Sequence, residues 1–383
     1  MRILLITSRY LPHHGGLETV VHELASHMQS IGHDVQIVTQ RSPRSLPSIE
    51  TLDKIRVTRL MFLYPEWRAL KTGRLALWLV GFLYLPLTLI QLYNYVRQFK
   101  PDVINFHYVG NPALFVWLLK HLYHVPLIVS LHGADVDAIP FEGRFKCWLF
   151  KAVLNQATQI TVCSRVLINQ ALKLSPENAS KAMVIHNGVD AGLFAAISPY
   201  SHPRPYVFAV GQLGRHKGFD ILIDAFAKVS SAYPDLDLLI AGEGREEETL
   251  QTQIQSAGLT GRAVLLGGVS HDQVAALMCG SLLIAIPSRR EPFGIVGLEA
   301  MASGRPMVVR RVDGLVEALD GAILTWVDDE RPESLADALR QTLASSDRDH
   351  RVGANQEKVL SHSWATVAEQ YLDLFTTVLT QTV

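Results

Sequence analysis

Short apolar runs alternate with longer helical stretches along the whole chain, and this alternation limits the possible folds more than any other feature. A first series of candidate strands covers residues 2 to 7, 34 to 39, 102 to 107, 126 to 132, 159 to 163 and 182 to 188, and a second covers 206 to 211, 236 to 242, 263 to 268 and 281 to 288. Helical stretches such as 17 to 31 and 144 to 156 lie between them. This order is typical of parallel sheets with crossover helices. The sequence therefore predicts an α/β protein with two doubly wound domains.

The length of 383 residues also favours two domains, because single hydrophobic cores rarely grow so large. Proline and polar residues concentrate at residues 196 to 205, where we expect the domain boundary. We predict an N-terminal domain over residues 1 to 197, a C-terminal domain over 198 to 362 and a final amphipathic helix within 363 to 383. Ligands of open α/β sheets bind beyond the carboxyl ends of the strands, so we expect the two sheets to face a central cleft.

Charge is divided unevenly along the chain. Residues 1 to 197 contain 19 Lys and Arg against 12 Asp and Glu, a formal charge of +7, whereas residues 198 to 383 contain 16 against 24, a formal charge of −8. A basic half attracts anionic lipid headgroups or a lipid-linked phosphate. No basic run with interleaved aromatic residues suggests a nucleic-acid-binding module.

Cysteine usage and the N-terminus are typical of a cytoplasmic protein. Cys147, Cys163 and Cys279 are far apart and form no CxxC pair, which argues against a disulfide framework or a zinc ribbon. The apolar run at residues 2 to 7 is too short for a signal peptide, so we expect no secretion.

Residues 75 to 93 form a nearly uncharged segment of 19 residues, just under the roughly 20 that span a bilayer. A spanning helix would separate the strand at residues 2 to 7 from its partner strands. We therefore favour either a helix on a membrane surface or a helix buried between the sheet and its neighbours, and both remain open. The side chains suited to the headgroup region are Trp67, Trp78, Tyr84, Lys54, Arg56, Arg59, Arg68, Lys71 and Arg74.

The stretch EPFGIVGLEAMASGRP, residues 291 to 306, contains a predicted helix start. Pro292 suits the first helical position, where no amide hydrogen is needed. Gly294 lets a ligand approach the amides of Ile295 and Val296. These amides and the helix dipole favour an anion or a sugar hydroxyl.

Two carboxylates, Glu291 and Glu299, flank this helix start. At about 1.5 Å per helical residue they would lie about 12 Å apart. Carboxylates that hydrolyse a glycosidic bond lie roughly 5 to 9.5 Å apart, so this pair does not fit hydrolysis. The spacing fits the two ends of one long ligand, such as a nucleotide sugar.

The same stretch resembles the Glu-x7-Glu motif of retaining glycosyltransferases with the GT-B fold, and the EAMASGRP that ends it is similar to glycosyltransferase family 4. The resemblance implies two Rossmann-like domains, a nucleotide-diphosphate sugar as donor, and no metal or other cofactor. It implies that Glu291 contacts the transferred sugar and that Glu299 holds the ribose hydroxyls. Phe293 of the motif joins the candidate donor-binding residues. The resemblance also implies that the final helix crosses back to the N-terminal domain.

The second domain opens with VGQLGRHKGFDILIDAFA, where basic residues precede a helix. A diphosphate leaving group needs positive charge as its bond to the sugar breaks, and Lys217 supplies it. The resembling family commonly has Arg directly after the first glycine, Gly211, but this chain has Gln212. We expect Arg215 to substitute for it. A solvated basic turn is the alternative.

Further glycines are candidate donor contacts. Gly242 and Gly244 follow a predicted strand and would let the nucleotide base contact the backbone. Gly15 and Gly16 precede the first helix, and the resemblance implies a loop that closes over the donor and shapes the acceptor side. From the residues alone, a simple tight turn fits as well. The G-x-G-x-x-G spacing is absent, which argues against an NAD oxidoreductase.

His132 ends a predicted strand, and the resemblance implies that its carbonyl or ring stabilises positive charge at the anomeric carbon of the transferred sugar. Asp135 and Asp137 form a DxD, a pattern that binds metal in the other large glycosyltransferase fold. This pattern is common by chance, and the resemblance implies a reaction without metal.

These features predict a cytoplasmic hexosyltransferase, retaining and peripheral at the inner face of the plasma membrane. The donor is a nucleotide sugar, and the acceptor, lipid-linked or a saccharide, binds the N-terminal domain. Two alternatives stay open. One is a nucleotide-sugar epimerase or hydrolase of the same fold, and the other is a catalytically silent, membrane-associated binding protein, which Gln212 keeps open.

Overall fold

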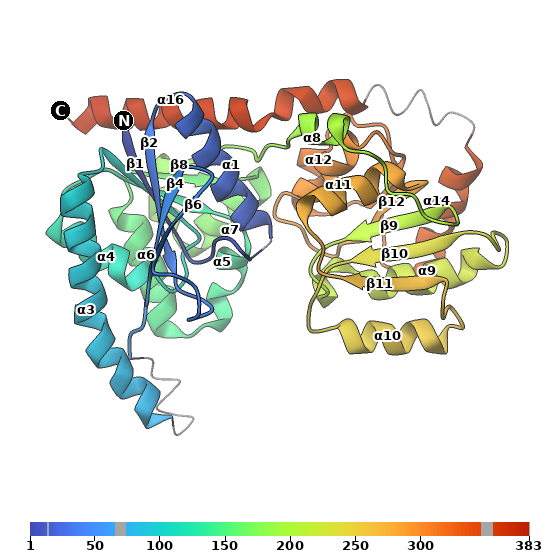
Figure 1. Ribbon diagram of the computed structural model, residues 1–383, viewed down its shortest axis with the longest axis horizontal. Coiled ribbons are helices and arrows are strands. Elements are labelled where there is room, and N and C mark those ends of the chain that lie inside the picture. The colour runs from blue at the N-terminus through green and yellow to red at the C-terminus, as the bar shows by residue number, and fades with distance from the viewer. Residues whose placement is uncertain (14, 66–73, 346–354, 383) are drawn as a thin grey trace. The chain divides into compact units, whose positions relative to one another are not determined.

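The computed structural model of the protein describes residues 1–13, 15–65, 74–345 and 355–382 (Figure 1). The chain divides into two compact units. The first contains Met1–His186 and Val367–Val383, and the second contains Asn187–Thr366. Both are α/β units built on a largely parallel sheet, as the sequence predicts.

The first unit is built on a sheet with the strand order β3-β4-β2-β1-β5-β6-β7-β8. In chain order the strands are β1 (Arg2–Thr7), β2 (Asp34–Gln40), β3 (Ile49–Leu52), β4 (Ile55–Leu60), β5 (Val103–His107), β6 (Leu127–Leu131), β7 (Gln159–Val162) and β8 (Ala182–Val184). The helices are α1 (Gly16–Ser30), α3 (Leu75–Phe99), α4 (Ala113–Leu122), α5 (Ala134–Asp137), α6 (Arg144–Gln156), α7 (Arg165–Leu174) and α16 (Trp364–Thr382), with 3-10 turns η1 (Ile139–Phe141) and η2 (Pro176–Lys181). Strands β5 and β6 are buried along their whole length, as expected for parallel strands covered on both faces.

The second unit has the strand order β11-β10-β9-β12-β13-β14, and all of its described pairs are parallel. The strands are β9 (Tyr206–Val210), β10 (Asp237–Ala241), β11 (Ala263–Gly267), β12 (Leu283–Ile286), β13 (Met307–Arg310) and β14 (Thr325–Val327). The helices are α8 (Ala191–Ala196), α9 (Phe219–Ser230), α10 (Glu247–Ser256), α11 (His271–Gly280), α12 (Ile295–Ala302), α13 (Asp313–Ala318) and α14 (Pro332–Ala344), with 3-10 turns η3 (Arg215–Lys217) and η4 (Leu360–His362). Its core lies between the sheet and helices α9, α10 and α14.

The division between the units falls before the proline-rich stretch in which we expected it. Helix α8 belongs to the second unit because it packs against α11 and α12. The thiol of Cys279 on α11 lies 3.6 Å from Phe194 O on α8. At the other end, α16 contributes its residues from Val367 onward to the first unit, where Phe375 and Val378 are fully buried.

A hairpin of β3 and β4 adds two strands that the sequence did not predict. Its turn residues Asp53 and Lys54 both have positive φ, as tight hairpins require. The hairpin also corrects one expectation for the membrane surface. Arg59 on β4 is only 2% exposed, forms an ion pair with Glu50 and donates a hydrogen bond to Leu11 O at 2.6 Å. Its guanidinium therefore stabilises the fold and is not available to lipid headgroups.

Candidate active site

The helix start after Glu291 differs from the prediction. Helix α12 begins at Ile295 and not at Pro292, because the chain first turns at Gly294, which has a φ of 91°. A Cβ at Gly294 would lie 2.4 Å from Leu315 Cδ2, so a glycine is required here. Ile295 and the residue after it occupy the first helical positions, whose amides have no partner within a helix. They remain suited to an anion or a hydroxyl.

Lys217 and Glu291 form the centre of the candidate site. The Lys217 ammonium donates a hydrogen bond to Glu291 Oε1 and forms an ion pair with it. The two side chains are only 16% and 8% exposed. The Ser288 hydroxyl donates a second hydrogen bond to the same oxygen at 3.2 Å. Because an ammonium has three donors, Lys217 can bind an anion while it keeps Glu291 in place.

Arg289 holds the loop that carries Lys217 against the loop that carries Glu291. Its amide donates to His216 O at 2.7 Å. Its guanidinium donates to both carboxylate oxygens of Asp220, at 2.6 and 2.7 Å. Such bidentate pairs fix geometry as well as charge. The sequence does not single out Arg289, because nothing in its context distinguishes it from a surface arginine.

The glycines predicted to bind the donor allow two loops of the second unit to pack closely. A Cβ at Gly242, whose φ is 137°, would lie 1.9 Å from Gly211 O. At Gly244 a Cβ would lie 2.2 Å from Leu213 O. A hydrogen bond of 2.8 Å from Leu213 N to Glu243 O joins the same loops. The backbone atoms that lie so close to Gly242 and Gly244 therefore belong to Gly211 and Leu213 of the same chain, whereas the sequence suggested an approach of the donor.

Glu299 lies on α12 and pairs with a residue that the sequence did not single out. His271 Nε2 is 3.1 Å from Glu299 Oε1. The Glu299 side chain is 14% exposed and the His271 side chain 35%, so both can reach a ligand. The only sequence signal for His271 is its position: it is the first residue of α11, after the N-cap Ser270.

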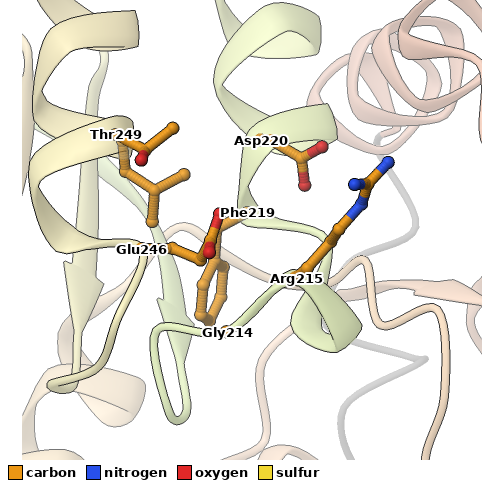
Figure 2. Close-up of a pocket in the computed structure, with 7 residues that line it drawn as sticks. Gly214, Arg215, Phe219, Asp220, Glu246 and Thr249 are labelled. Atoms are coloured by element: carbon orange, nitrogen blue, oxygen red, sulfur yellow. The ribbon is translucent and has the colours of Figure 1, made fainter.

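Arg215 and Phe293 do not join the Lys217–Glu291 pair. Arg215 lines a pocket of about 130 Å³ together with Asp220 and Glu246, and Figure 2 shows its side chain beside Asp220. Its guanidinium has no ion pair or hydrogen bond within the described chain, because Asp220 binds Arg289 instead. The Phe293 side chain is 2% exposed and packs in the core, which does not favour the contact with the donor that the sequence predicts.

Gly15 precedes α1, as the sequence predicts, whereas Gly16 is already its first residue. The helix start also holds an acid. Gly15 is the N-cap residue, and a Cβ there would lie 2.8 Å from Glu18 Oε2. Glu18 is 5% exposed. Its carboxylate occupies the positive end of the helix dipole, where it would compete with an anionic ligand.

His132 follows β6 in the first unit and stacks on His107. Their ring centroids lie 5.3 Å apart, and His107 Nδ1 is 3.1 Å from His132 Nε2. Burial lowers the pKa of His132 to about 4 and holds the pKa of His107 well below its usual value. Both imidazoles are therefore neutral near pH 7, and one donates its hydrogen to the other.

The final helix contributes to the polar network beside these histidines. The Tyr371 hydroxyl lies 3.2 Å from Thr161 Oγ1 and 3.4 Å from Ser130 Oγ. Asn105 Nδ2 also donates to Ser130 Oγ, at 2.8 Å. Strands β5, β6 and β7 each supply one of these residues, so the network crosses three neighbouring strands. The sequence did not predict it, because polar residues inside apolar strands give no signal of what they bond.

Asp135 of the DxD binds backbone amides. Its two oxygens accept hydrogen bonds from the amides of Val109, His132 and Gly133, at 3.2, 3.0 and 2.9 Å. The residue is 2% exposed, and burial raises the pKa of its carboxyl to about 6. Among the described residues, no group of three or more His, Cys, Asp or Glu side chains is placed to hold a metal ion. Asp135 thus ties the loop of His132 to the loop after β5.

Asp135→Asn is expected to change how stability depends on pH. The folded state raises this pKa from 3.8 to about 6, so protonated Asp135 favours folding at low pH and that contribution is lost as the pH rises through about 6. At about 1.4 kcal/mol per pKa unit the full difference is about 3 kcal/mol, and about 2 kcal/mol of it falls between pH 4 and pH 6. Urea unfolding of wild type and variant across this range measures it. Asp320→Asn, an exposed carboxylate, is the control, and parallel curves for Asp135→Asn and wild type would contradict the assignment.

Two family models together match most of the chain. Residues 14–193 match the model of Glycosyltransferase Family 4, and residues 195–359 match that of Glycosyl transferases group 1. Among similar curated proteins, the glycogen synthase of Mycobacterium tuberculosis is 28% identical, and the match covers 96% of this chain and 92% of the relative. The phosphatidyl-myo-inositol mannosyltransferase of Mycobacterium leprae is 29% identical, with 99% and 98% covered.

Solved structures share the arrangement of strands and helices. The sucrose-phosphate synthase of Thermosynechococcus elongatus superposes with a TM-score of 0.81 at 20% identity, and the match covers 100% of both chains. At this identity the likeness concerns the fold.

Proposed function

Because the chain belongs to glycosyltransferase family 4, we propose that it is a retaining hexosyltransferase that uses a nucleotide-diphosphate sugar as donor. Its two parallel α/β domains are the Rossmann-like domains of the GT-B fold. The proposed acceptor is a lipid-linked or saccharide hydroxyl. The relatives support these classes, since one is named a glycogen synthase and another a phosphatidyl-myo-inositol mannosyltransferase.

The observation that carries the proposal is the buried contact between Lys217 and Glu291, with Glu299 eight residues further along the chain. In the proposal, Lys217 neutralises the departing diphosphate and Glu291 binds hydroxyls of the transferred sugar. Glu299, oriented by His271, binds the ribose. The free amides at the start of α12 then face the phosphates or the sugar. We propose Arg215 as a second cation for the diphosphate, since its guanidinium is unpaired within the described chain.

In the proposed reaction the bond between the anomeric carbon and the diphosphate oxygen breaks, and a bond to the acceptor oxygen forms on the same face. The acceptor proton passes to the departing phosphate, so no protein nucleophile is needed. His132 supports the positive charge that develops on the sugar. A neutral imidazole suits this role, and burial lowers the pKa of His132 to about 4. We also propose that the reaction needs no metal, which activity in the presence of a chelator would test.

Two alternative activities differ from transfer in what they require. A nucleotide-sugar epimerase or hydrolase turns over its donor without an acceptor, and a silent binding protein does not turn it over at all. Gln212, in place of the arginine common in the family, is the observation that favours the silent protein. Release of nucleoside diphosphate that depends on an added lipid or saccharide acceptor would indicate transfer, and release without an acceptor would indicate hydrolysis. Conversion of the donor into its epimer would indicate an epimerase, and no change of the donor a silent protein.

We expect the correct donor to raise the thermal stability of the protein. A ligand at a hundred times its Kd adds about 2.7 kcal/mol to the free energy of unfolding. UDP-glucose, ADP-glucose and GDP-mannose are the probes, and differential scanning fluorimetry is the measurement. Glu299→Gln should weaken the shift from every probe, because the ribose loses one of two acceptor oxygens and the negative charge. Glu333→Gln on the exposed part of α14 should leave the shift unchanged. Equal shifts in both variants would refute the ribose role of Glu299.

A further inference from the structure

In helix α3, apolar side chains face outward over the first four turns, unlike in a surface helix of a soluble protein. The side that packs on the first unit carries small and polar groups. A Cβ at Gly81 would lie 2.5 Å from Tyr64 C, and the Thr88 hydroxyl donates to Met61 O at 2.8 Å. Further along, the Tyr95 hydroxyl donates to Gln36 Oε1 at 2.6 Å. Between Leu75 and Ile90, most of the large aliphatic side chains point the other way, and the buried ones, such as Leu92 and Val96, come only in the last turns.

The outer side of the helix is a continuous apolar stripe, here called the apolar face of α3. It comprises Leu75, Leu79, Phe82, Leu83, Leu87 and Ile90, and each of these side chains is at least half exposed. The spacing of three or four residues places them along one side over four turns. Exposed patches of this kind on monomeric proteins mark binding sites for proteins or membranes. The apolar face therefore corrects one of the two expectations for residues 75 to 93: the helix is not buried on both sides.

The fold excludes a helix that crosses the bilayer. Over Trp78–Phe99 the mean hydropathy is 1.4, so by length and composition alone this one described helix could span a membrane. However, β4 before the helix and β5 after it belong to the same sheet. The last turns of α3 also pack on that unit, since Leu92 and Val96 are fully buried. Only its outer side is available to lipid.

An exposed aromatic cluster adjoins α3. Phe141 is 90% exposed, Phe145 43% and Trp148 48%, and the last two rings stack with centroids 5.8 Å apart. Tyr64 links the cluster to the helix, because it contacts Phe145 and also lies against Gly81. Exposed aromatic side chains of this kind are enriched at the boundary between lipid tails and headgroups.

The charge around these residues fits an anionic surface. Arg74 lies at the start of α3, and Arg97 and Lys100 lie at its end, all three exposed. The N-terminal half, residues 1 to 197, has a formal charge of +7. A second copy of this chain would present the same basic surface and be repelled. An anionic bilayer has the opposite charge and also takes up apolar side chains.

We propose that the apolar face of α3, together with Phe141, Phe145 and Trp148, is a docking surface for an anionic lipid bilayer. The helix lies in the plane of the interface with its aliphatic side chains among the lipid tails, and Arg74, Arg97 and Lys100 meet the headgroups. This inference does not depend on the proposed activity, although it would bring a lipid-linked acceptor to the enzyme. It also agrees with the sequence-based expectation of a protein that is peripheral at the inner face of the membrane. Of the headgroup residues expected from the sequence, Trp67, Arg68 and Lys71 lie outside the described residues.

The test is sedimentation of the full chain with phosphatidylcholine vesicles that contain or lack phosphatidylglycerol. Wild type should bind only the anionic vesicles, and raising the salt concentration should lower the bound fraction several-fold because the headgroup attraction is screened. The double variant Leu83→Glu with Leu87→Glu should lower the bound fraction about tenfold, since charged groups replace aliphatic ones that would lie among the lipid tails. Phe141→Ser with Trp148→Ser tests the aromatic cluster in the same way.

A matched control and a second measurement make the outcome decisive. Leu360→Glu replaces a leucine of the second unit that is 64% exposed, and it should bind like wild type. Unchanged circular dichroism and nucleotide-sugar stabilisation would show that the α3 variant is folded. Sedimentation equilibrium then distinguishes the partners. Failure of wild type to bind vesicles, or a dimer that the Leu83 and Leu87 changes dissociate, would overturn the proposal.

Discussion

Lys217→Ala is expected to lower turnover by about 100- to 1,000-fold, the range found when one preorganised charge partner of a transition state is removed. The departing diphosphate gains negative charge as the sugar bond breaks, and Lys217 is the cation fixed beside Glu291. The expected loss lies mainly in kcat, because that charge is largest in the transition state. Release of nucleoside diphosphate in the presence of acceptor is the measurement.

A structural effect of Lys217→Ala must be separated from a catalytic one. Removal of one partner from a buried ion pair leaves the other charge uncompensated, which costs up to about 3 to 5 kcal/mol. The double variant Lys217→Ala with Glu291→Gln removes that charge and should recover much of the stability without recovering turnover. Lys228→Ala, which breaks an exposed pair with Glu333, is the matched control and should retain activity. Near-normal turnover of Lys217→Ala would refute the role of the ammonium.

The parts of the fold that could be predicted are those encoded by continuous apolar runs. All ten predicted strands are present, and most of them are buried along much of their length, which requires nearly unbroken β-branched or aliphatic residues. Strands β13 and β14 were not predicted. The hairpin of β3 and β4 was missed because its sequence, IETLDKIRVTRL, mixes charged and apolar residues. Its buried cation, Arg59, is compensated by Glu50, and such a pairing is a tertiary contact that spacing alone does not reveal.

The site could be predicted only where residues are close in sequence. The segment from Glu291 to Glu299 was found because a single helix start orders it. The contact of Lys217 with Glu291 joins residues far apart in sequence, so the sequence suggested each residue but not the bond between them. His271 and Arg289 were missed for the same reason. His271 contacts Glu299 and Arg289 contacts Asp220, and no sequence motif indicates contacts of this kind.

Glycines were the least predictable of the candidate residues. A glycine after a strand fits a ligand that approaches the backbone, but it fits a neighbouring loop of the same chain equally well. The sequence favoured the ligand at Gly242 and Gly244. In the structure both positions face backbone oxygens, of Gly211 and Leu213, at distances that no Cβ tolerates. This difference leads to a direct test.

Gly242→Ala is expected to destabilise the second unit by about 3 kcal/mol, because a strained backbone conformation and a steric overlap add together. At a φ of 137° an alanine is itself strained, and its Cβ would lie 1.9 Å from Gly211 O. Since Gly211 precedes the loop of Lys217, separation of these loops should also disturb the ammonium. Urea unfolding measures the loss of stability, and assays of folded protein at low temperature measure the loss of turnover.

Gly258→Ala separates strain from overlap. Gly258 also has a positive φ, of 71°, but no atom lies within 4 Å of the position of its Cβ. An alanine there should cost only about 1 to 2 kcal/mol, the usual penalty of the left-handed conformation. If Gly242 served the donor alone, Gly242→Ala would unfold like Gly258→Ala and lose only its stabilisation by nucleotide sugars. If Gly242 serves loop packing, Gly242→Ala should lose more stability than Gly258→Ala even without a ligand, because the atom that meets its new methyl group belongs to the protein.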